Sequence, residues 1–240
     1  MEIIAHRGFN GRFPEMSELA YEKALELPIH GVECDVRLSK NGELVCVHDA
    51  HFLRVAGDPR RVSTLTMSEI RHIPIEFEGL TSYSVSLDDL LDLVLPTGKH
   101  LYIETKHPVA EGRMVEEAVA LCLERHGLLH DERIHLISFS HLAMRRARKL
   151  MPDIDRYYLR RDWEQRVNPR DIQLSRPTGL GLSVERARRH VELVGAQGLK
   201  TYVWTANTIE ELHFCYTAGV DYVATDFPDR GLEVVASLSL

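Results

Sequence analysis

The chain has 240 residues, of which 44% are hydrophobic and 27% charged, and its formal net charge is −7. This length and composition predict a soluble globular protein with room for one large core. The negative charge argues against general nucleic-acid binding, because domains that bind nucleic acids usually carry a net positive charge. The four cysteines have no zinc-like spacing, and no apolar run approaches the roughly 20 residues that span a bilayer. We therefore expect a cytoplasmic protein without stable membrane insertion.

Short apolar runs recur along the chain and end in polar residues. The first of them leads directly into His6-Arg7-Gly8, and the next, residues 31–36, alternates so that Glu33 and Asp35 share one face of a strand. Further runs deliver His48-Asp49 and Glu104 at their ends. The expected core strands lie around Ile3, Val32, Leu101, Ile134, Ile154, Gly179, Tyr202 and Tyr222.

Helical patterns separate these eight strands, and eight βα units in one chain of this length predict a (β/α)8 TIM barrel. The alternative, a doubly wound sheet, would need a glycine-rich phosphate loop, and no G-x-G-x-x-G occurs. The βα rhythm breaks after the first fifty residues, in a stretch that we interpret as an excursion and not as a separate domain. Capping patterns predict helix starts at Thr66-x-x-Glu69, Ser86-x-x-Asp89 and Asn207-x-x-Glu210.

Three carboxylates, Glu33, Asp35 and Glu104, are expected at the carboxyl ends of neighbouring barrel strands. Acidic groups in one low-dielectric mouth repel each other, and a bound cation relieves that repulsion. Oxygen ligands favour a hard ion, so the pattern predicts a Ca²⁺ or Mg²⁺ site. The alternative is an ion-pair network with nearby basic residues, Arg7, Arg37 or Lys106.

Two of the 13 histidines, His6 and His48, end strands on the expected active face. Imidazoles titrate near neutral pH and can divide general-acid and general-base duty between them. Zinc ligation by this pair is the alternative, and it is less favoured because the carboxylates already form an oxygen site.

Positive charge accompanies the acidic cluster. Arg7 and Lys106 suit a phosphate ester, while the alternative role for both is charge balance of the carboxylates. Trp204 ends a strand, where it is expected either to form a wall of the substrate pocket or to pack in the core.

In their order and spacing these residues resemble the glycerophosphodiester phosphodiesterase family. The similarity covers residues 3 to about 228, essentially the whole chain. The family's Asn-Thr after Pro-Glu is replaced here by Met16-Ser17, which removes an amide from this corner of the pocket. The matching segments are His6-Arg7-Gly8, Pro14-Glu15, Glu33-Cys34-Asp35, His48-Asp49, Glu104-Thr105-Lys106, Trp204-Thr205 and Thr225-Asp226-Phe227-Pro228.

The resemblance implies one barrel domain over residues 1–240, with an insertion at about 50–98. It also implies hydrolysis of a small-molecule glycerophosphodiester to sn-glycerol 3-phosphate and an alcohol, with Ca²⁺ or Mg²⁺ as cofactor and Mn²⁺ as a third option. Nothing in the sequence indicates an oligomeric state. The implied residues are Glu33, Asp35 and Glu104 for the metal, His6 and His48 for proton transfer, and Arg7 and Lys106 for phosphate.

Two alternative functions remain at this point. One is a related barrel that cleaves lysophospholipids in the manner of a phospholipase D or C. The short loops and the lack of a basic amphipathic helix weigh against it. The other is a non-catalytic barrel that binds a phosphate ester, for which the Met16 substitution is the only support.

Overall fold

The computed structural model describes residues 1–162 and 169–239. In this part of the chain eight parallel strands form one sheet in the order β1-β11-β10-β9-β8-β7-β6-β2, and pairing of β1 with β2 closes it. The expected (β/α)8 TIM barrel is thereby confirmed. Its strands are β1 (Glu2–Ala5), β2 (Gly31–Leu38), β6 (His100–Thr105), β7 (Ile134–Ser138), β8 (Asp155–Arg160), β9 (Gly179–Ser183), β10 (Lys200–Trp204) and β11 (Tyr222–Thr225).

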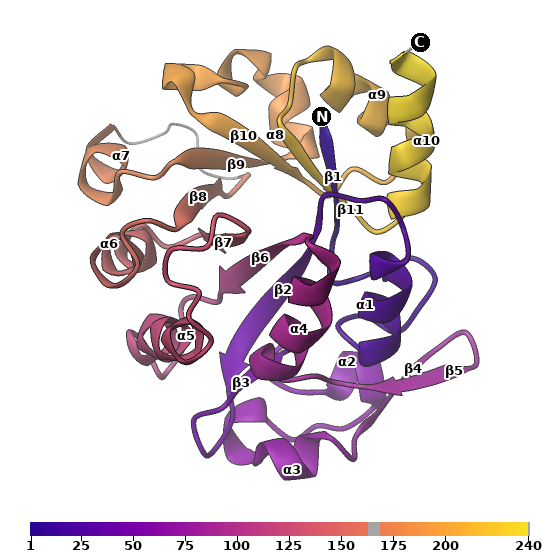
Figure 1. Cartoon of the computed structure of the whole chain (residues 1–240), viewed down its shortest axis with the longest axis vertical. Helices are drawn as coiled ribbons and strands as arrows, with labels where there is room; N and C mark the ends of the chain where they lie inside the picture. The colour runs from indigo at the N-terminus through magenta and orange to yellow at the C-terminus, as the bar shows by residue number, and fades with distance from the viewer. Residues whose placement is uncertain (163–168, 240) are drawn as a thin grey trace.

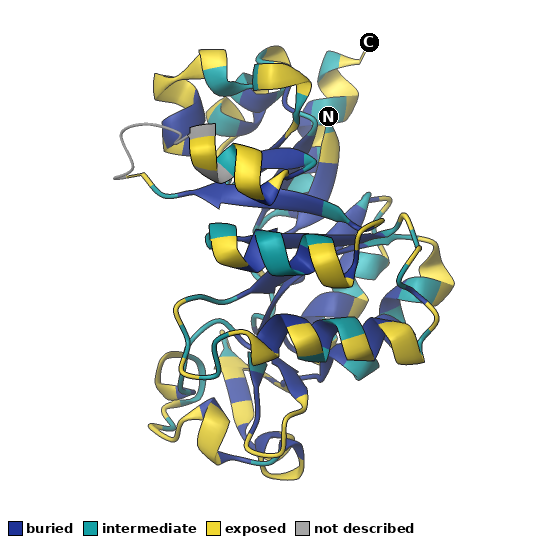
Figure 2. Ribbon diagram, turned by 90° about the vertical axis from the view of Figure 1, so that its left-hand side faces the viewer, coloured by how far each residue is buried: buried dark blue, intermediate teal, exposed yellow. Residues whose placement is uncertain are grey.

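Helices surround the barrel and bury one face each, as the blue inner and yellow outer surfaces in Figure 2 show. Apolar side chains between strands and helices form the main core, which includes Val32, Cys34 and Val36 from β2. Tyrosine-rich packing fills the interior of the barrel. The helices are α1 (Glu18–Leu25), α4 (Leu87–Val94), α5 (Met114–Arg125), α6 (His141–Leu150), α7 (Pro169–Ser175), α8 (Val184–Arg189), α9 (Ile209–Thr217) and α10 (Pro228–Leu238), with one-turn 3-10 helices at Val62–Thr64, Leu95–Thr97, Val191–Leu193 and Ala196–Gly198.

The predicted helix starts are mostly correct. Ser86 caps α4 and Thr66 caps the short helix α3 (Met67–Ile70), each with a complete capping box. The start expected at Asn207 is wrong by one residue, because Thr208 caps α9 and pairs with Glu211. Asn207 is instead directed to the end of β11. None of the described helices combines the length and apolar character needed to cross a membrane.

The first part of the segment 50–98 lies at the bottom of Figure 1, whereas its last helix, α4, packs on the main core beside α1. Besides α3 and α4 it contains α2 (Leu53–Ala56) and the hairpin β4 (Pro74–Phe77) to β5 (Leu80–Tyr83), and it follows the short strand β3 (Leu44–Cys46). A small apolar cluster around Phe52 and Ile70 packs the segment against β3. The hairpin was not expected from the sequence. Its turn uses Glu78 and Gly79, both at positive φ, and Glu is not a usual residue in such a turn.

Three histidines, His30, His100 and His135, lie together at the amino-terminal end of the barrel, opposite the strand tips where the candidate site residues lie. The His30 and His100 rings stack at 3.9 Å, and His100 Nδ1 lies 2.8 Å from His135 Nε2. Burial lowers the pKa of His30 to about 4 and that of His135 to about 3, and it also lowers the pKa of His100. The three rings are therefore neutral at pH 7 and are held as a stacked, hydrogen-bonded group.

Acidification from about pH 7 to about pH 5.5 is expected to lower the free energy of unfolding by about 2–3 kcal/mol through His30 and His135. Their pKa values are depressed in the folded state, so their contribution is complete above pH 6.5 and is lost as pH falls toward about 4 and about 3. Because the raised pKa values of Glu33 and Glu104 act in the opposite direction over this pH range, urea unfolding at the two pH values measures this loss as the difference between wild type and a histidine variant. On acidification, His135→Gln should lose less unfolding free energy than wild type. The exposed control His72→Gln should lose as much as wild type. An equal loss in all three proteins would contradict the prediction.

Candidate active site

A cluster of three buried carboxylates lies at the carboxyl ends of β2 and β6. Asp35 and Glu104 are direct neighbours in the parallel ladder, and Glu33 lies one inward-facing position earlier on β2. The side chains are almost completely buried, with exposed fractions of 1% for Glu33 and Asp35 and 7% for Glu104. One oxygen of each lies within 4.8 Å of the others. The period of two in β2 and its register with β6 thus bring these three acids together.

Two cations contact this carboxylate cluster. Lys106 Nζ lies 2.7 Å from Asp35 Oδ1 and 2.8 Å from Glu104 Oε1. Arg7 Nε lies 3.3 Å from Asp35 Oδ2, and the Arg7 backbone N–H donates to Glu33 Oε2 at 3.0 Å. The ion-pair network considered as an alternative therefore exists, with Arg7 and Lys106 in it. Arg37 takes no part in it, since its Nε donates to the carbonyl oxygen of His48 at 2.8 Å.

The electrostatics of the cluster are unequal. Burial and the charge of Asp35 raise the pKa of Glu33 and raise that of Glu104 to about 7. Burial acts in the same direction on Asp35, but the charges of Lys106 and Arg7 outweigh it and hold its pKa below the usual range. Asp35 is therefore the ionised centre of the cluster, and the two glutamates need further positive charge to ionise fully near neutral pH.

The donor set fits a hard divalent cation. Both oxygens of Asp35 are buried, and the ion pairs that they make leave them without a hydrogen bond of normal geometry in the described part of the chain. Three buried carboxylates against two basic side chains also leave one negative charge unbalanced when all are ionised. Oxygen ligands of this kind suit Ca²⁺, Mg²⁺ or Mn²⁺.

His6 follows β1 directly and is held by an aspartate from the last strand end. Its Nδ1 lies 2.7 Å from Asp226 Oδ1, and its Nε2 lies 4.0 Å from Glu33 Oε2. Asn207 fixes Asp226 in turn, because Asn207 Nδ2 donates to Asp226 Oδ2 at 2.6 Å and the Asp226 N–H donates to Asn207 Oδ1 at 2.9 Å. With Nδ1 committed to Asp226, the Nε2 atom of His6 is free for proton transfer on the side of the carboxylates.

His48 has a matching arrangement. Its Nδ1 lies 2.7 Å from Asp49 Oδ1, and Arg54 Nε donates to the other oxygen of Asp49 at 2.7 Å. Arg54 also contacts both carboxylate oxygens of Glu15 at 2.6 and 2.7 Å. Burial and the charge of Lys106 lower the pKa of His48. Each of the two candidate histidines is thus oriented through Nδ1 by its own aspartate.

The turn after β1 positions Arg7 through an unusual backbone. Arg7 and Gly8 have φ values of 57° and 77°. A Cβ atom on Gly8 would lie 2.9 Å from backbone atoms of Ala20, so helix α1 packs against the turn at a distance that only glycine allows. This close packing directs the Arg7 N–H to Glu33.

Met16, the departure from the family pattern, also adopts a positive φ of 52°. Its side chain is 2% exposed and packs in the main core, while its N–H donates to the carbonyl oxygen of Arg7 at 3.0 Å. This corner of the site is thus supported by the Met16 backbone, and the missing amide is replaced by apolar packing.

A pocket of about 480 Å³, here called the reaction pocket, reaches the cluster at Glu104 and Lys106. Trp204 lines it and packs edge to face against Phe139, with ring centroids 5.4 Å apart. The structure therefore places Trp204 in a pocket wall as well as against the barrel interior. The lining residues are Arg37, His48, Glu104, Lys106, His107, Pro108, Phe139, Arg161, Asp162 and Trp204.

All the candidate site residues from the sequence gather at this end of the barrel. Two positioning residues, Asp226 and Asn207, were not predicted. The signal for Asp226 was present, because Thr225-Asp226 ends the strand that pairs with β1, and the closure of the barrel places it beside His6. Asn207 had been interpreted as a helix cap, so its contact with Asp226 was missed.

The carboxyl face of the strands is where (β/α)8 barrels carry their chemistry, and the acids, bases and histidines gathered there define this chain as a barrel enzyme. Within that class it belongs to the Glycerophosphoryl diester phosphodiesterase family, whose model matches residues 6–230.

Relatives support this assignment along the whole chain. A probable glycerophosphodiester phosphodiesterase 1 of Mycobacterium tuberculosis is 33% identical over 95% of this chain and 90% of its own length. A glycerophosphodiester phosphodiesterase of Bacillus altitudinis is 30% identical over 97% of both chains. Among solved structures, an Oleispira antarctica phosphodiesterase in complex with the product sn-glycerol-3-phosphate has a TM-score of 0.87 at 23% identity, covering 98% of this chain and 97% of that one.

Proposed function

We propose that this enzyme hydrolyses glycerophosphodiesters to sn-glycerol 3-phosphate and an alcohol. We further propose that it uses a divalent cation held by Glu33, Asp35 and Glu104. The observation that carries the proposal is the pair of aspartate-held histidines, His6 and His48, beside these buried carboxylates. The names of the relatives support the reaction, and the product bound to the Oleispira antarctica enzyme supports the nature of the released phosphate.

Hydrolysis of the diester needs one proton removed and one delivered. A neutral imidazole accepts a proton from the nucleophile as its oxygen bonds to phosphorus, and the other imidazole, protonated, donates to the alkoxide as the P–O bond to the alcohol breaks. The nucleophile is either water, which gives sn-glycerol 3-phosphate directly, or the glycerol 2-hydroxyl, which gives a cyclic phosphate that water then opens. Asp226 and Asp49 hold the Nδ1 atoms of His6 and His48, so Nε2 is the transferring atom in both. The two histidine–aspartate pairs are alike. Which histidine acts as the base and which as the acid therefore depends on the orientation of the bound substrate.

The phosphate is recognised by positive charge. When bound, a divalent cation neutralises phosphate oxygens and orients the nucleophile. Arg7 and Lys106 add charge-assisted hydrogen bonds from the same side, because both already face the carboxylate cluster. Trp204 and Phe139, which contact each other edge to face, add apolar surface to the pocket that Lys106 also lines.

The test is a product assay with controlled metal. Protein treated with EDTA is incubated with glycerophosphocholine after addition of Ca²⁺, Mg²⁺ or Mn²⁺ singly, and sn-glycerol 3-phosphate is measured enzymatically. We expect product only with added cation. Product at the same rate in EDTA would refute the cation requirement, and no product from any glycerophosphodiester would refute the function.

The same assay separates the alternatives. Faster turnover of lysophospholipid micelles than of soluble glycerophosphocholine would favour a phospholipase-like enzyme. Phosphate-ester binding in calorimetry without product would favour a binding protein. No observation of the described residues favours either one, and the boundary of the insertion at about 50–98 stays a prediction.

A further inference from the structure

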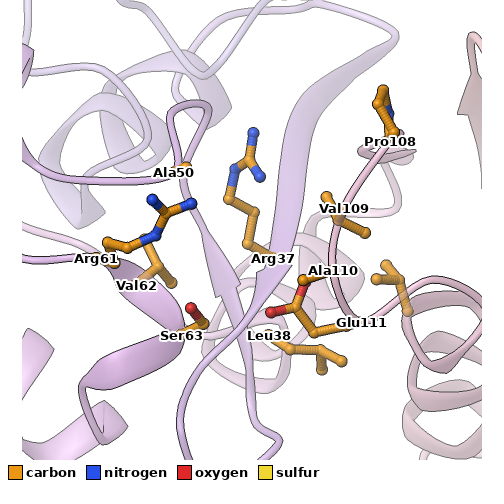
Figure 3. A pocket seen from close by; sticks show the side chains of 11 residues that line it. Arg37, Leu38, Ala50, Arg61, Val62, Ser63, Pro108, Val109, Ala110 and Glu111 are labelled. Atoms are coloured by element: carbon orange, nitrogen blue, oxygen red, sulfur yellow. The ribbon is translucent and has the colours of Figure 1, made fainter.

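A second pocket adjoins the reaction pocket. It has a volume of about 620 Å³, and Arg37 and Pro108 line both pockets. We call it the side pocket (Figure 3). Apolar side chains line much of it, together with two arginines and one glutamate. The lining residues are Arg37, Leu38, Ala50, Arg61, Val62, Ser63, Pro108, Val109, Ala110, Glu111 and Val115.

Arg37 connects the two pockets. It lies two residues after Asp35 on β2, so the alternation that turns Glu33 and Asp35 to the site turns Arg37 the same way, nearer the rim. Its Nε donates to the carbonyl oxygen of His48 at 2.8 Å, which fixes the side chain. The two terminal nitrogens make no hydrogen bond to any described residue and are left to face the pocket in Figure 3.

Arg61 brings a second positive charge from the segment after β3. Its backbone pairs with His51, and the next residue, Val62, donates to the carbonyl oxygen of Ala50, so the base of the side chain is fixed. In Figure 3 the guanidinium groups of Arg61 and Arg37 lie on either side of Ala50.

These two arginines differ from their neighbours. Arg54 is paired with Glu15 and Asp49, and Arg60 is paired with Asp58. Within residues 1–162 and 169–239, by contrast, neither Arg37 nor Arg61 makes an ion pair with a carboxylate. Nearby carboxylates, Glu111 among them, act on Arg37 at longer range. Because no direct ion pair neutralises either guanidinium group, the two together can bind an anion in this pocket.

The position of the side pocket indicates which part of a substrate reaches it. Glu104 and Lys106 bring the carboxylate cluster into the lining of the reaction pocket, and the side pocket adjoins it at Arg37, whose Nε binds the His48 backbone. A diester bound with its phosphate at Lys106 has two organic halves, and the half that extends past His48 meets Arg37 and then Arg61. Glu111 on the facing wall adds a partner for an ammonium group.

We propose that the side pocket binds the alcohol half of the diester and selects alcohols that carry a second anionic group, a carboxylate or a phosphate. This inference rests on the proposed function. A serine ester matches the pocket most fully, because its carboxylate can pair with Arg37 and Arg61 while its ammonium group faces Glu111.

A matched pair of substrates tests the proposal. Glycerophosphoserine and glycerophosphoethanolamine differ only by the carboxylate, so the ratio of their kcat/KM values isolates its contribution. We expect the wild type to favour the serine ester by about tenfold, the gain that one charge-assisted contact supplies. Arg61→Ala should remove most of this preference. The control Arg60→Ala, whose side chain is paired with Asp58 and does not line the pocket, should retain it.

A second pair separates the two anions. The kcat/KM of glycerophosphoglycerol is compared with that of the same ester carrying a terminal phosphate. If Arg61→Ala lowers the preference for the phosphorylated ester but not the preference for the serine ester, the pocket selects phosphate. If both ratios are the same in wild type and Arg61→Ala while the diesters are hydrolysed, the side-pocket proposal is overturned and the proposed function stands. If no diester is hydrolysed, the proposed function fails. In that case, calorimetry with the same substrate pairs tests the side pocket independently of activity. Tighter binding of the anionic ester to wild type than to Arg61→Ala supports the side-pocket proposal, and equal binding contradicts it.

Discussion

Replacement of either His6 or His48 by alanine is expected to lower kcat for glycerophosphodiester hydrolysis by about 10³-fold, within the usual range for loss of a general acid or base. Each imidazole has its Nδ1 held by an aspartate and its Nε2 available to the reacting groups. Without either ring, one of the two proton transfers passes to solvent. Initial rates with saturating glycerophosphocholine and added cation measure the loss.

The control for these histidine variants is His213→Ala, which removes an exposed imidazole from α9. It should retain wild-type turnover. Thermal unfolding of all variants shows whether the barrel is intact, since His6 also anchors Asp226. A folded His6→Ala or His48→Ala protein with turnover within about tenfold of wild type would show that the proton-transfer assignment is wrong.

The carboxylate cluster illustrates what a sequence can predict when the fold is regular. Strand alternation alone places Glu33 and Asp35 on one face, and the structure has Val32, Cys34 and Val36 on the other, in the core. The parallel register of β2 and β6 then sets Asp35 beside Glu104. Strand periodicity and the order of strands in the barrel are sufficient to predict this cluster. The position of each acid follows from its place on its strand and does not depend on an individual side-chain contact.

The positioning residues were harder to predict. Asp226 lies 220 residues from His6, and only the pairing of β1 with β11 brings the two together. Asn207 satisfies a local capping pattern by composition, yet Thr208 provides the cap, and the amide of Asn207 is used at the end of β11. When a side chain has both a local and a distant partner, the residues next to it in the sequence do not show which of the two it binds.

Arg37 shows the same limit for charge. In the sequence it is a natural ion-pair partner for Asp35, two residues earlier on the same face. In the structure Lys106 and Arg7 occupy both oxygens of Asp35, and Arg37 binds the His48 backbone instead. This competition among three cations for one carboxylate leaves the Arg37 guanidinium directed to the side pocket, where the sequence indicated no function for it.

Asp35→Asn is expected to lower the free energy of unfolding of the metal-free protein by about 3 kcal/mol, the lower end of the cost of breaking a buried ion pair. Asp35 is 1% exposed and lies between Lys106 at 2.7 Å and Arg7 at 3.3 Å, so its replacement leaves two half-buried cations with less negative charge. Relief of repulsion with Glu33 and Glu104 offsets part of the cost. Urea unfolding in EDTA measures the change, and Asp92→Asn, at an exposed position of α4, is the matched control.

The same Asp35→Asn variant should lose the response to cation. In wild type, a cation at about 100 times its Kd is expected to stabilise the fold by about 2.7 kcal/mol, because it binds the folded state only. Loss of a direct ligand should weaken cation binding by more than about 100-fold, since outer-shell changes alone cost 10–100-fold, and the stabilisation should disappear at that concentration. Calorimetric titration of Ca²⁺ and Mg²⁺ gives the affinity independently of activity. If the Asp35→Asn protein is as stable as wild type and is still stabilised by cation, Asp35 is neither the centre of the ion-pair network nor a metal ligand.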